Sequence, residues 1–109
     1  MTPDHHPLCH LDDIPNNGSK GFSYQGQAIF AVRKNDNVFV YSNQCPHLGL
    51  PLEWQADKFL TNDDSLIQCA THGALFEIDS GQCIVGPCQG QKLIRIETSI
   101  HDQFVYCNL

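Results

Sequence analysis

Hydrophobic residues in this chain occur in short runs between polar turns, and this spacing is typical of β-strands rather than helices. Residues 29–32 and 38–41 form the clearest pair of runs, because both are rich in β-branched and aromatic residues. The stretch 34–37 between them reads Lys-Asn-Asp-Asn, which is the composition of a turn. We therefore expect a β-hairpin over residues 29–41.

A second hairpin is expected near the C-terminus. Residues 93–97 alternate in part, which would place Ile94 and Ile96 together on one face of a strand. The chain would then turn at 101–103 and return through the apolar run 104–107. The remaining expected elements are short strands near 8–11, 66–69 and 75–78, a turn at 79–81, and a helix-compatible stretch at 52–60.

These elements together predict an all-β fold, either an antiparallel β-sandwich or a small barrel. A middle section, about residues 44–78, is poorer in strands than the rest of the chain. The length of 109 residues fits one small domain, so we expect a single domain over 1–109.

The chain is acidic, with twelve Asp and Glu against six Lys and Arg and a formal net charge of −6. This charge disfavours nucleic acid and anionic membranes as partners. No stretch approaches the ~20 apolar residues that a membrane-spanning helix needs. The first six residues are polar and acidic, unlike the basic and then apolar start of a signal peptide, so we expect a cytoplasmic protein.

Six cysteines in so short a chain would indicate a disulfide scaffold in a secreted protein, but nothing in this sequence favours secretion. Two segments instead combine a thiol with an imidazole, Cys45-Pro46-His47-Leu48-Gly49 and Cys69-Ala70-Thr71-His72-Gly73. A spacing of two or three residues lets one turn direct both side chains into one cavity, and four such ligands suit a soft metal. From the ligands alone, a structural Cys₂His₂ zinc site stays open beside an iron–sulfur site.

The paired motif, C-P-H-L-G followed by C-x-x-H-G, resembles the two cluster-binding loops of Rieske-type [2Fe–2S] proteins. The resemblance implies that Cys45 and Cys69 hold one iron of the cluster and that His47 and His72 hold the other. It extends to Gly86-Pro87-Cys88, which is similar to the proline loop that packs over the cluster in this family.

The same resemblance implies the Rieske fold, in which a small cluster-binding subdomain carries two ligand loops and is inserted in an antiparallel base domain. Here the inserted subdomain would span about 44–78. Twenty-one residues separate His47 from Cys69, a few more than is usual in the ferredoxin branch of the family. We expect the excess to form a longer loop within the polar stretch 58–65.

Differences from the respiratory members of the family predict a low reduction potential. Those members join the two loops by a disulfide, but the corresponding positions here are Leu50 and Thr71. They also place hydroxyl groups beside the cluster where this chain has Ala74 and Phe76. Donors to the sulfur atoms stabilise the reduced cluster, so their absence should leave the potential near the low end of the Rieske range, about −150 mV. The chain thus resembles soluble ferredoxins of ring-hydroxylating oxygenases and the nitrite reductase small subunit.

The resemblance implies a one-electron carrier that passes electrons from a flavin-dependent reductase to a terminal oxygenase or another redox acceptor. The chain has neither a Gly-rich dinucleotide-binding motif nor room for a mononuclear iron domain, so we expect catalysis to belong to partner chains. Partners would dock near His47 and His72, beside an apolar rim of Leu48, Leu50 and Pro87. Two alternatives remain, a permanent small subunit of a nitrite reductase-like complex and a metal-stabilised binding or redox-sensing module.

The remaining cysteines and histidines have simpler interpretations. Cys9 and Cys107 lie in apolar runs and are expected to act as small buried hydrophobic residues. Cys88 is expected to be a packed thiol, and a disulfide between Cys83 and Cys88 is disfavoured in a reducing compartment. The histidines outside the two motifs are expected to be solvated, namely His5, His6, His10 and His101.

Overall fold

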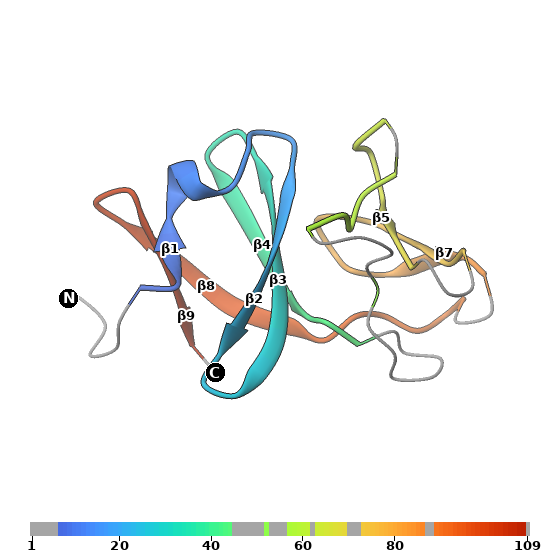
Figure 1. The fold of residues 1–109 in the computed structure, drawn as a ribbon. Helices are drawn as coiled ribbons and strands as arrows, with labels where there is room; N and C mark the ends of the chain where they lie inside the picture. The colour runs from blue at the N-terminus through green and yellow to red at the C-terminus, as the bar shows by residue number, and fades with distance from the viewer. Residues whose placement is uncertain are drawn as a thin grey trace.

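Two antiparallel sheets of unequal size make up the fold (Figure 1). The computed structural model describes residues 7–44, 52, 57–61, 63–69, 73–86 and 89–108. The larger sheet, here called the base sheet, has the strand order β1-β9-β8-β4-β3-β2, and the small sheet has the order β5-β6-β7. The two sheets lie side by side in Figure 1, along a molecule with principal extents of 41 × 26 × 23 Å.

The base sheet contains all the long strands that the structure describes, and a single 3₁₀ turn, η1, follows its first strand. Its elements are β1 (Cys9–His10), η1 (Leu11–Asp13), β2 (Ser19–Tyr24), β3 (Gln27–Lys34), β4 (Asn37–Ser42), β8 (Arg95–His101) and β9 (Phe104–Asn108).

Both hairpins that the hydrophobic pattern predicts are present in the base sheet. β3 pairs with β4 from Ile29 opposite Ser42 to Lys34 opposite Asn37, so the turn lies in the predicted polar stretch. β8 pairs with β9 and turns at residues 102–103. The alternation of side chains buries Ile29, Ala31 and Val40 on the inner face of this curled sheet. The predicted all-β fold is confirmed in the described part of the chain.

β2 is a strand that the hydrophobic pattern does not predict. Its sequence, Ser-Lys-Gly-Phe-Ser-Tyr, is mostly polar and contains a glycine. It forms because β3 offers it a complete ladder, from Ser19 opposite Val32 to Tyr24 opposite Gln27. The outer edge of β2 meets another segment, since the backbone N–H of Gly21 donates to Oδ1 of Asp57 at 2.8 Å.

Two expectations from the sequence are wrong. Ile94 does not share a buried face with Ile96, because β8 begins at Arg95 and the side chain of Ile94 is 61% exposed. Within 52–60, residues 57–60 are not helical, because Asp57 has φ +64° and Leu60 forms a β-bridge with Ile67. Residues 53–56 lie outside the described part.

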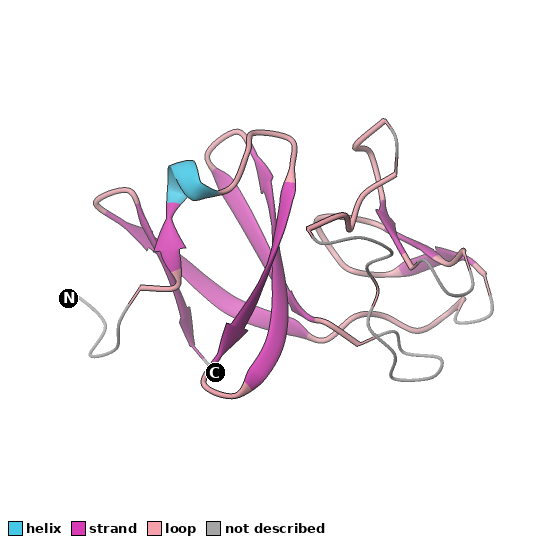
Figure 2. Ribbon diagram, viewed as in Figure 1, coloured by secondary structure: helices cyan, strands magenta, loops and turns pink. Residues whose placement is uncertain are grey.

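The small sheet consists of very short strands joined by turns, as Figure 2 shows. These strands are β5 (Ile67–Gln68), β6 (Leu75–Phe76) and β7 (Cys83–Val85). The small sheet therefore extends beyond residue 78, and the boundaries 44–78 of an inserted subdomain stay a prediction. No helix among the described residues has the length and hydrophobicity of a membrane span.

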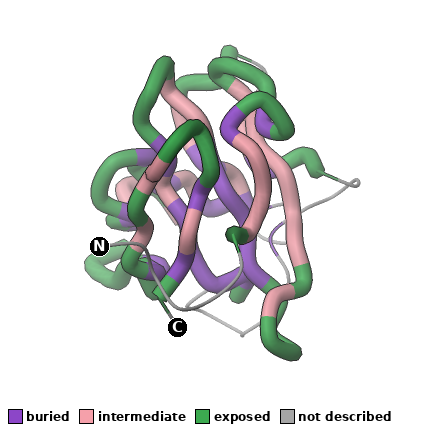
Figure 3. Tube along the Cα trace, turned by 90° about the vertical axis from the view of Figure 1, so that its left-hand side faces the viewer, coloured by how far each residue is buried: buried purple, intermediate pink, exposed green. Residues whose placement is uncertain are grey.

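Buried residues form two clusters, and Figure 3 shows the buried positions running along the middle of the strands. One cluster lies on the curled inner face of the base sheet. The other joins the two sheets, because it contains Phe30 and Tyr41 of the base sheet together with Ile67 and Phe76 of the small sheet. Within it, the hydroxyl of Tyr41 donates to the carbonyl of Ile78 at 2.6 Å. The small sheet is thus packed on the base sheet by a shared core.

Candidate metal centre

The second predicted ligand motif lies where the chain turns between β5 and β6. Beyond the last strand pair, the N–H of Cys69 donates to the carbonyl of Ala74 at 2.8 Å, and the N–H of Gly73 donates to the carbonyl of Cys69 at 2.9 Å. Gly73 has φ +67°, a left-handed conformation that glycine adopts without strain. The two described ends of this motif, Cys69 and Gly73, are therefore held together by backbone hydrogen bonds.

The first predicted ligand motif is in a segment whose two ends are held together. The backbone N–H of Leu52 donates to Oδ1 of Asn43 at 2.9 Å, and both residues are buried. The N–H of Asn43 in turn donates to the carbonyl of Ala28 at 3.0 Å, which fixes it to the base sheet. Cys45 and His47 lie between these two anchors in the sequence. The side chain of Asn43 thus closes the segment that carries the first motif.

The predicted proline loop begins beside the second motif. Gly86 has φ +111°, and a Cβ atom on it would lie 2.8 Å from the Cα of Ala74. The N–H of Gln89 donates to the carbonyl of Gly86 at 3.2 Å, and the N–H of Cys83 donates to the carbonyl of Gln91 at 2.9 Å. The backbone of Gly86 therefore packs directly against Ala74, where only glycine leaves enough room.

Of the four predicted ligands, Cys69 lies in the described part of the chain, and Cys45, His47 and His72 lie outside it. Leu48, Leu50, Thr71, Pro87 and Cys88 also lie outside it. Cys69 is fully buried and belongs to the same cluster as Leu52, which closes the first segment. The structure thus brings the anchors of both motifs together, while the four-ligand set stays a prediction.

Among the described residues, no three His, Cys, Asp or Glu side chains gather closely enough to hold a metal ion. Burial raises the pKa of the Cys9 and Cys107 thiols to about 11. Both lie in strands that pack on the base-sheet core, as predicted. The thiol of Cys83 donates to the carbonyl of Val85 at 3.2 Å. Cys83 is thus buried as a thiol in β7.

His10 keeps 37% of its side chain exposed, and it is also bonded to the residues that follow it. Its Nδ1 accepts a hydrogen bond from the backbone N–H of Asp12 at 3.1 Å, while the backbone N–H of His10 donates to Oδ2 of Asp13 at 3.0 Å. The imidazole also packs edge-on against Phe104 with a centroid distance of 5.0 Å. His101 likewise packs against Tyr106 at 5.6 Å. These histidines hold strand ends in place. His5 and His6 lie outside the described residues.

In the polar stretch 58–65, where the sequence predicts a longer loop, the described residues from Thr61 to Leu66 form a closed turn. The N–H of Thr61 donates to the carbonyl of Leu66 at 2.9 Å, which closes the loop. Asp63 organises it, accepting hydrogen bonds from the hydroxyls of Ser65 at 2.7 Å and Thr61 at 2.6 Å. The Ser65 hydroxyl, followed by that of Thr61, lowers the pKa of Asp63 to about 2. The bonds within this loop thus come from its own residues.

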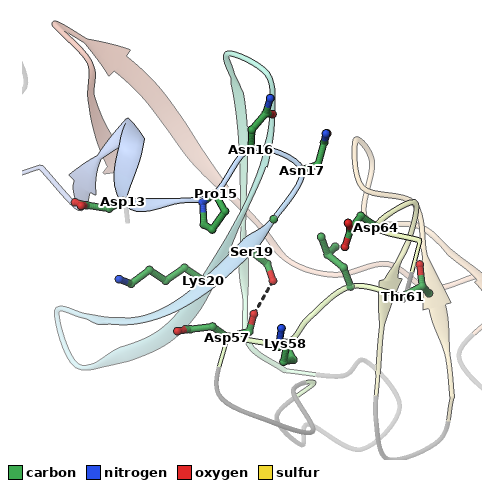
Figure 4. A pocket seen from close by; sticks show the side chains of 12 residues that line it. Asp13, Pro15, Asn16, Asn17, Ser19, Lys20, Asp57, Lys58, Thr61 and Asp64 are labelled. Carbon is green, nitrogen blue, oxygen red and sulfur yellow. Dashed lines mark hydrogen bonds between the residues drawn. The ribbon is translucent and has the colours of Figure 1, made fainter.

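A polar groove of about 940 Å³ separates this loop from the edge of the base sheet (Figure 4). Asp57 forms part of its floor, where the hydroxyl of Ser19 donates to the Asp57 carbonyl at 2.8 Å. None of the residues that line the groove belongs to the Cys69–Ala74 turn or the Gly86–Gln89 turn. The described residues that line the groove thus come from the edge of the base sheet around β2 and from the segment 57–64.

Residues 4–102 match the family profile described as "Rieske [2Fe-2S] domain". A curated relative is cholesterol 7-desaturase of Caenorhabditis elegans, which is 26% identical over 81 residues. The match covers 73% of this chain and 18% of the desaturase, so the chain spans less than a fifth of that relative.

Solved structures share the fold. The ferredoxin of carbazole 1,9a-dioxygenase from Nocardioides aromaticivorans IC177 superposes with a TM-score of 0.77 over 94% of each chain, at 20% identity. A complex of reduced oxygenase and oxidised ferredoxin in carbazole 1,9a-dioxygenase contains a chain that superposes with a TM-score of 0.75, at 20% identity. That match covers 94% of this chain and 90% of the other. At such identities the likeness establishes the fold.

Proposed function

The chain belongs to the Rieske [2Fe–2S] domain family, and from this membership we propose that it carries single electrons on a cluster held by Cys45, His47, Cys69 and His72. The cofactor of the family is a [2Fe–2S] cluster, which takes up and releases one electron when bound. The two thiolates would hold the inner iron and the two imidazoles the outer one.

The observation that carries this proposal is the position of Cys69. Its side chain is fully buried at the base of a closed turn, in the apolar cluster that also contains Leu52 at the end of the first motif. Zinc would fit the same four residues. The family match favours iron, and so does the packing of Gly86 on Ala74, which places the predicted proline loop beside the second motif.

The surroundings of Cys69 suit a cluster with this ligand set. Two ferric ions, two sulfides and two thiolates sum to zero charge, whereas four thiolates would leave −2. A neutral group needs no buried counter-ion, and burying an unpaired charge is costly. The segments 43–52 and 69–76 contain no Asp, Glu, Lys or Arg, and Ala74 and Phe76 beside Cys69 are buried and apolar. This uncharged setting fits the oxidised cluster.

We propose that the electrons pass from a flavin-dependent reductase to a terminal oxygenase, and that catalysis belongs to those partners. The ferredoxin of carbazole 1,9a-dioxygenase, which shares this fold over nearly its whole length, supports the oxygenase as acceptor. The predicted docking residues are His47 and His72 with Leu48 and Pro87 beside them. Small interfaces are usual in such electron-transfer encounters.

A second candidate is a permanent electron-transfer unit within a larger redox enzyme, such as the nitrite reductase-like complex expected from the sequence. The match to less than a fifth of a desaturase supports it, because the same domain there is one part of a much longer chain. A stable complex with a catalytic chain in gel filtration of the native extract would favour this candidate over a diffusing carrier.

The identity of the cofactor is tested by replacing each of two buried cysteines in the region of the small sheet. Anaerobically purified protein should contain two irons and two acid-labile sulfides per chain and give an axial electron paramagnetic resonance signal after dithionite. Cys69→Ser should remove the colour and the signal. Cys83→Ser should keep both, because Cys83 is equally buried but is bonded to Val85. A colourless wild type with stoichiometric zinc would overturn the proposal.

A further inference from the structure

One exposed face of the base sheet carries a continuous row of aromatic side chains. In β9 the alternation of side chains turns Val105 into the core and leaves Phe104 and Tyr106 on the opposite, outer face. His10 of β1 and His101 of β8 are the cross-strand partners of Phe104 on its two sides. We call the four residues His10, His101, Phe104 and Tyr106 the aromatic row.

The rings of the aromatic row are in contact with one another and are partly open to solvent. His10 packs edge-on against Phe104 with 5.0 Å between the ring centroids, and His101 packs against Tyr106 at 5.6 Å. Phe104 is 39% exposed and is one of the few large hydrophobic residues that the described structure leaves open to solvent. The row therefore offers ring surface on which another planar group can stack.

Carboxylates border the aromatic row. Oδ2 of Asp12 lies 3.8 Å from Nδ1 of His10, and the side chain of Asp12 is 77% exposed. Asp102 is exposed in the turn that directly follows His101. Glu97 is exposed on the same face of β8 as His101, four residues before it. The border of the row is therefore acidic on β8, at the turn after β8 and beside β1.

Two arginines lie near this border, and both are engaged by backbone carbonyls. Nη1 of Arg33 lies 3.7 Å from Oδ1 of Asp12, but its side chain is only 16% exposed and donates to the carbonyls of Leu11 and Ile14. Arg95 begins β8 and donates to the carbonyl of Asp79, which directs it toward the small sheet. Arg33 therefore offsets part of the charge of Asp12, and neither arginine covers the rings.

The lysines do not neutralise this border either. None of them belongs to β1, η1, β8 or β9, since they are Lys20, Lys34, Lys58 and Lys92. Lys20 lies over the ring of Phe22 on β2, and Lys34 donates to the carbonyl of Asp64. Within the described part of the chain, Asp102 and Glu97 form no ion pair. Their charge is therefore available to a partner.

The aromatic row lies at the end of the molecule away from the predicted cluster. Figure 1 shows β1 and β9 at one end and the small sheet at the other. The molecule is 41 Å long, whereas the Debye length at physiological ionic strength is about 8 Å. A partner at the row therefore interacts with its border charges and leaves the predicted electron-transfer end free.

We propose that the aromatic row docks a basic partner protein through arginine side chains, which stack on Phe104 and pair with Asp102 and Glu97. A guanidinium is planar, so it can stack on a ring and bind a carboxylate with paired hydrogen bonds. The acidic border repels phosphate groups, which disfavours nucleic acid and anionic lipid. It also repels the same face of a second copy of this chain. The inference goes beyond the proposed function, because it assigns a second surface that anchors the domain while the other end exchanges electrons.

The first test maps the row with L-argininamide as the probe, followed by the amide resonances of the ¹⁵N-labelled holoprotein. L-argininamide should shift the resonances of His101, Phe104 and Tyr106 in a saturable way. L-lysinamide carries the same charge without a planar cation, so it should bind more weakly by about threefold.

Matched variants separate the row from the general acidity of the chain. Phe104→Leu and Asp102→Asn should each raise the Kd for L-argininamide about threefold. Asp36→Asn removes one exposed carboxylate from the turn between β3 and β4 and should leave the Kd unchanged. Asp102 has φ +52°, which Asn tolerates, so this variant keeps the test valid if Phe104→Leu fails to fold. Resonance shifts centred elsewhere, or equal effects of Asp102→Asn and Asp36→Asn, would overturn the proposal.

The second test looks for the partner in the cells that make this protein, with p-benzoylphenylalanine in place of Phe104. Illumination should join the chain to another protein at a peptide that contains arginine. Asp102→Asn should reduce this cross-link, and Asp36→Asn should not. Absence of a cross-link, a cross-link to a second copy, or one to a peptide without basic residues would contradict the proposal. Each of these failures leaves the proposed function standing, whereas a protein that never takes up a cluster would defeat that function and not this docking surface.

Discussion

The base sheet and the small sheet are stabilised in different ways, although they share a core. The base sheet has strands of up to eight residues with continuous ladders, such as β3 between β2 and β4. The small sheet has strands of two or three residues, and its ladder shifts register between Leu75 and Phe76. Its shape depends on turns with positive φ at Gly73, Gly81 and Gly86. Regular hydrogen bonding therefore stabilises the base sheet. The small sheet and its turns, here called the lobe, contain predicted ligands and depend on turn conformations and close contacts.

This difference indicates that the lobe can carry functional residues while the base sheet maintains the fold. A two-residue strand contributes few hydrogen bonds, so the lobe needs other contacts to stay ordered. Tyr41, Asn43 and Gly86 supply three of them, and each joins a turn to a neighbouring element. A bound cluster would supply a fourth, because it would tie both ligand motifs together.

The largest expected effect is a difference in hydrogen exchange between the two sheets when the cluster is removed. Chelation of iron under reducing conditions should raise amide hydrogen exchange in β5, β6 and β7, while β3 and β4 stay protected. The reason is that metal ligation contributes folding free energy to the lobe and not to the base. Hydrogen-exchange mass spectrometry of the two states measures this. Equal loss of protection in both sheets would contradict the division.

The next largest effect concerns the contact between Gly86 and Ala74. Gly86→Ala should lower the free energy of unfolding by about 3 kcal/mol, since it adds both backbone strain and a clash. Gly90→Ala is the matched control, because Gly90 also has a positive φ, +92°, but a Cβ there meets no atom within 4 Å. Gly90→Ala should lower the free energy of unfolding by about 1 kcal/mol. Urea denaturation measures both, and equal costs would exclude the clash.

A smaller effect is expected where Tyr41 joins the two sheets. Tyr41→Phe leaves the buried carbonyl of Ile78 without this donor and should lower the free energy of unfolding by about 2 kcal/mol. Burial raises the pKa of Tyr41 to about 12, so its stabilising effect is complete below the ordinary value of 10 and is lost as pH rises toward 12. Thermal melts between pH 8 and 12 should therefore converge for the wild type and Tyr41→Phe. Tyr106→Phe, at a half-buried residue, should lower the free energy of unfolding by less than Tyr41→Phe does.

The smallest effect is expected at the exposed loop that Asp63 organises. Because the folded-state pKa of Asp63 is lowered to about 2 from 3.8, its contribution is present at neutral pH and is lost as pH falls from about 4 to 2. Asp63→Asn should lower the melting temperature slightly at pH 7 and not at pH 2. Asp36→Asn, in the exposed turn between β3 and β4, is the matched control for the loss of one surface carboxylate.

The sequence predicts the base sheet better than the lobe for the same physical reason that distinguishes the two regions. Residues 29–41 have the alternation and turn chemistry of a hairpin, and the structure confirms them. The hydrophobic pattern does not predict β2, because the stability of this strand comes from pairing with β3 rather than from its own residues. The stretch 52–60 is compatible with a helix when read alone, but Asp57 accepts a hydrogen bond from β2, 36 residues away in the sequence, and Leu60 forms a β-bridge with Ile67.

The candidate site could be predicted as motifs but not as contacts. The spacing of Cys69, His72 and Gly73 indicates a turn, and the hydrogen bond from the N–H of Gly73 to the carbonyl of Cys69 joins the two described ends of that segment. The anchoring of the first motif by Asn43 was missed. Its signal was an Asn at the end of a hydrophobic run and two residues before Cys45, since Asn commonly caps turns. Its partner Leu52 cannot be read from spacing alone.

The most direct test of the central claim is a crystal structure of the anaerobically prepared holoprotein with anomalous data collected at the iron edge. The account predicts two iron atoms bridged by sulfide, the inner one bound by the sulfurs of Cys45 and Cys69 and the outer one by the imidazoles of His47 and His72. A single metal ion among these side chains, or four side chains too far apart to share a cluster, would contradict it.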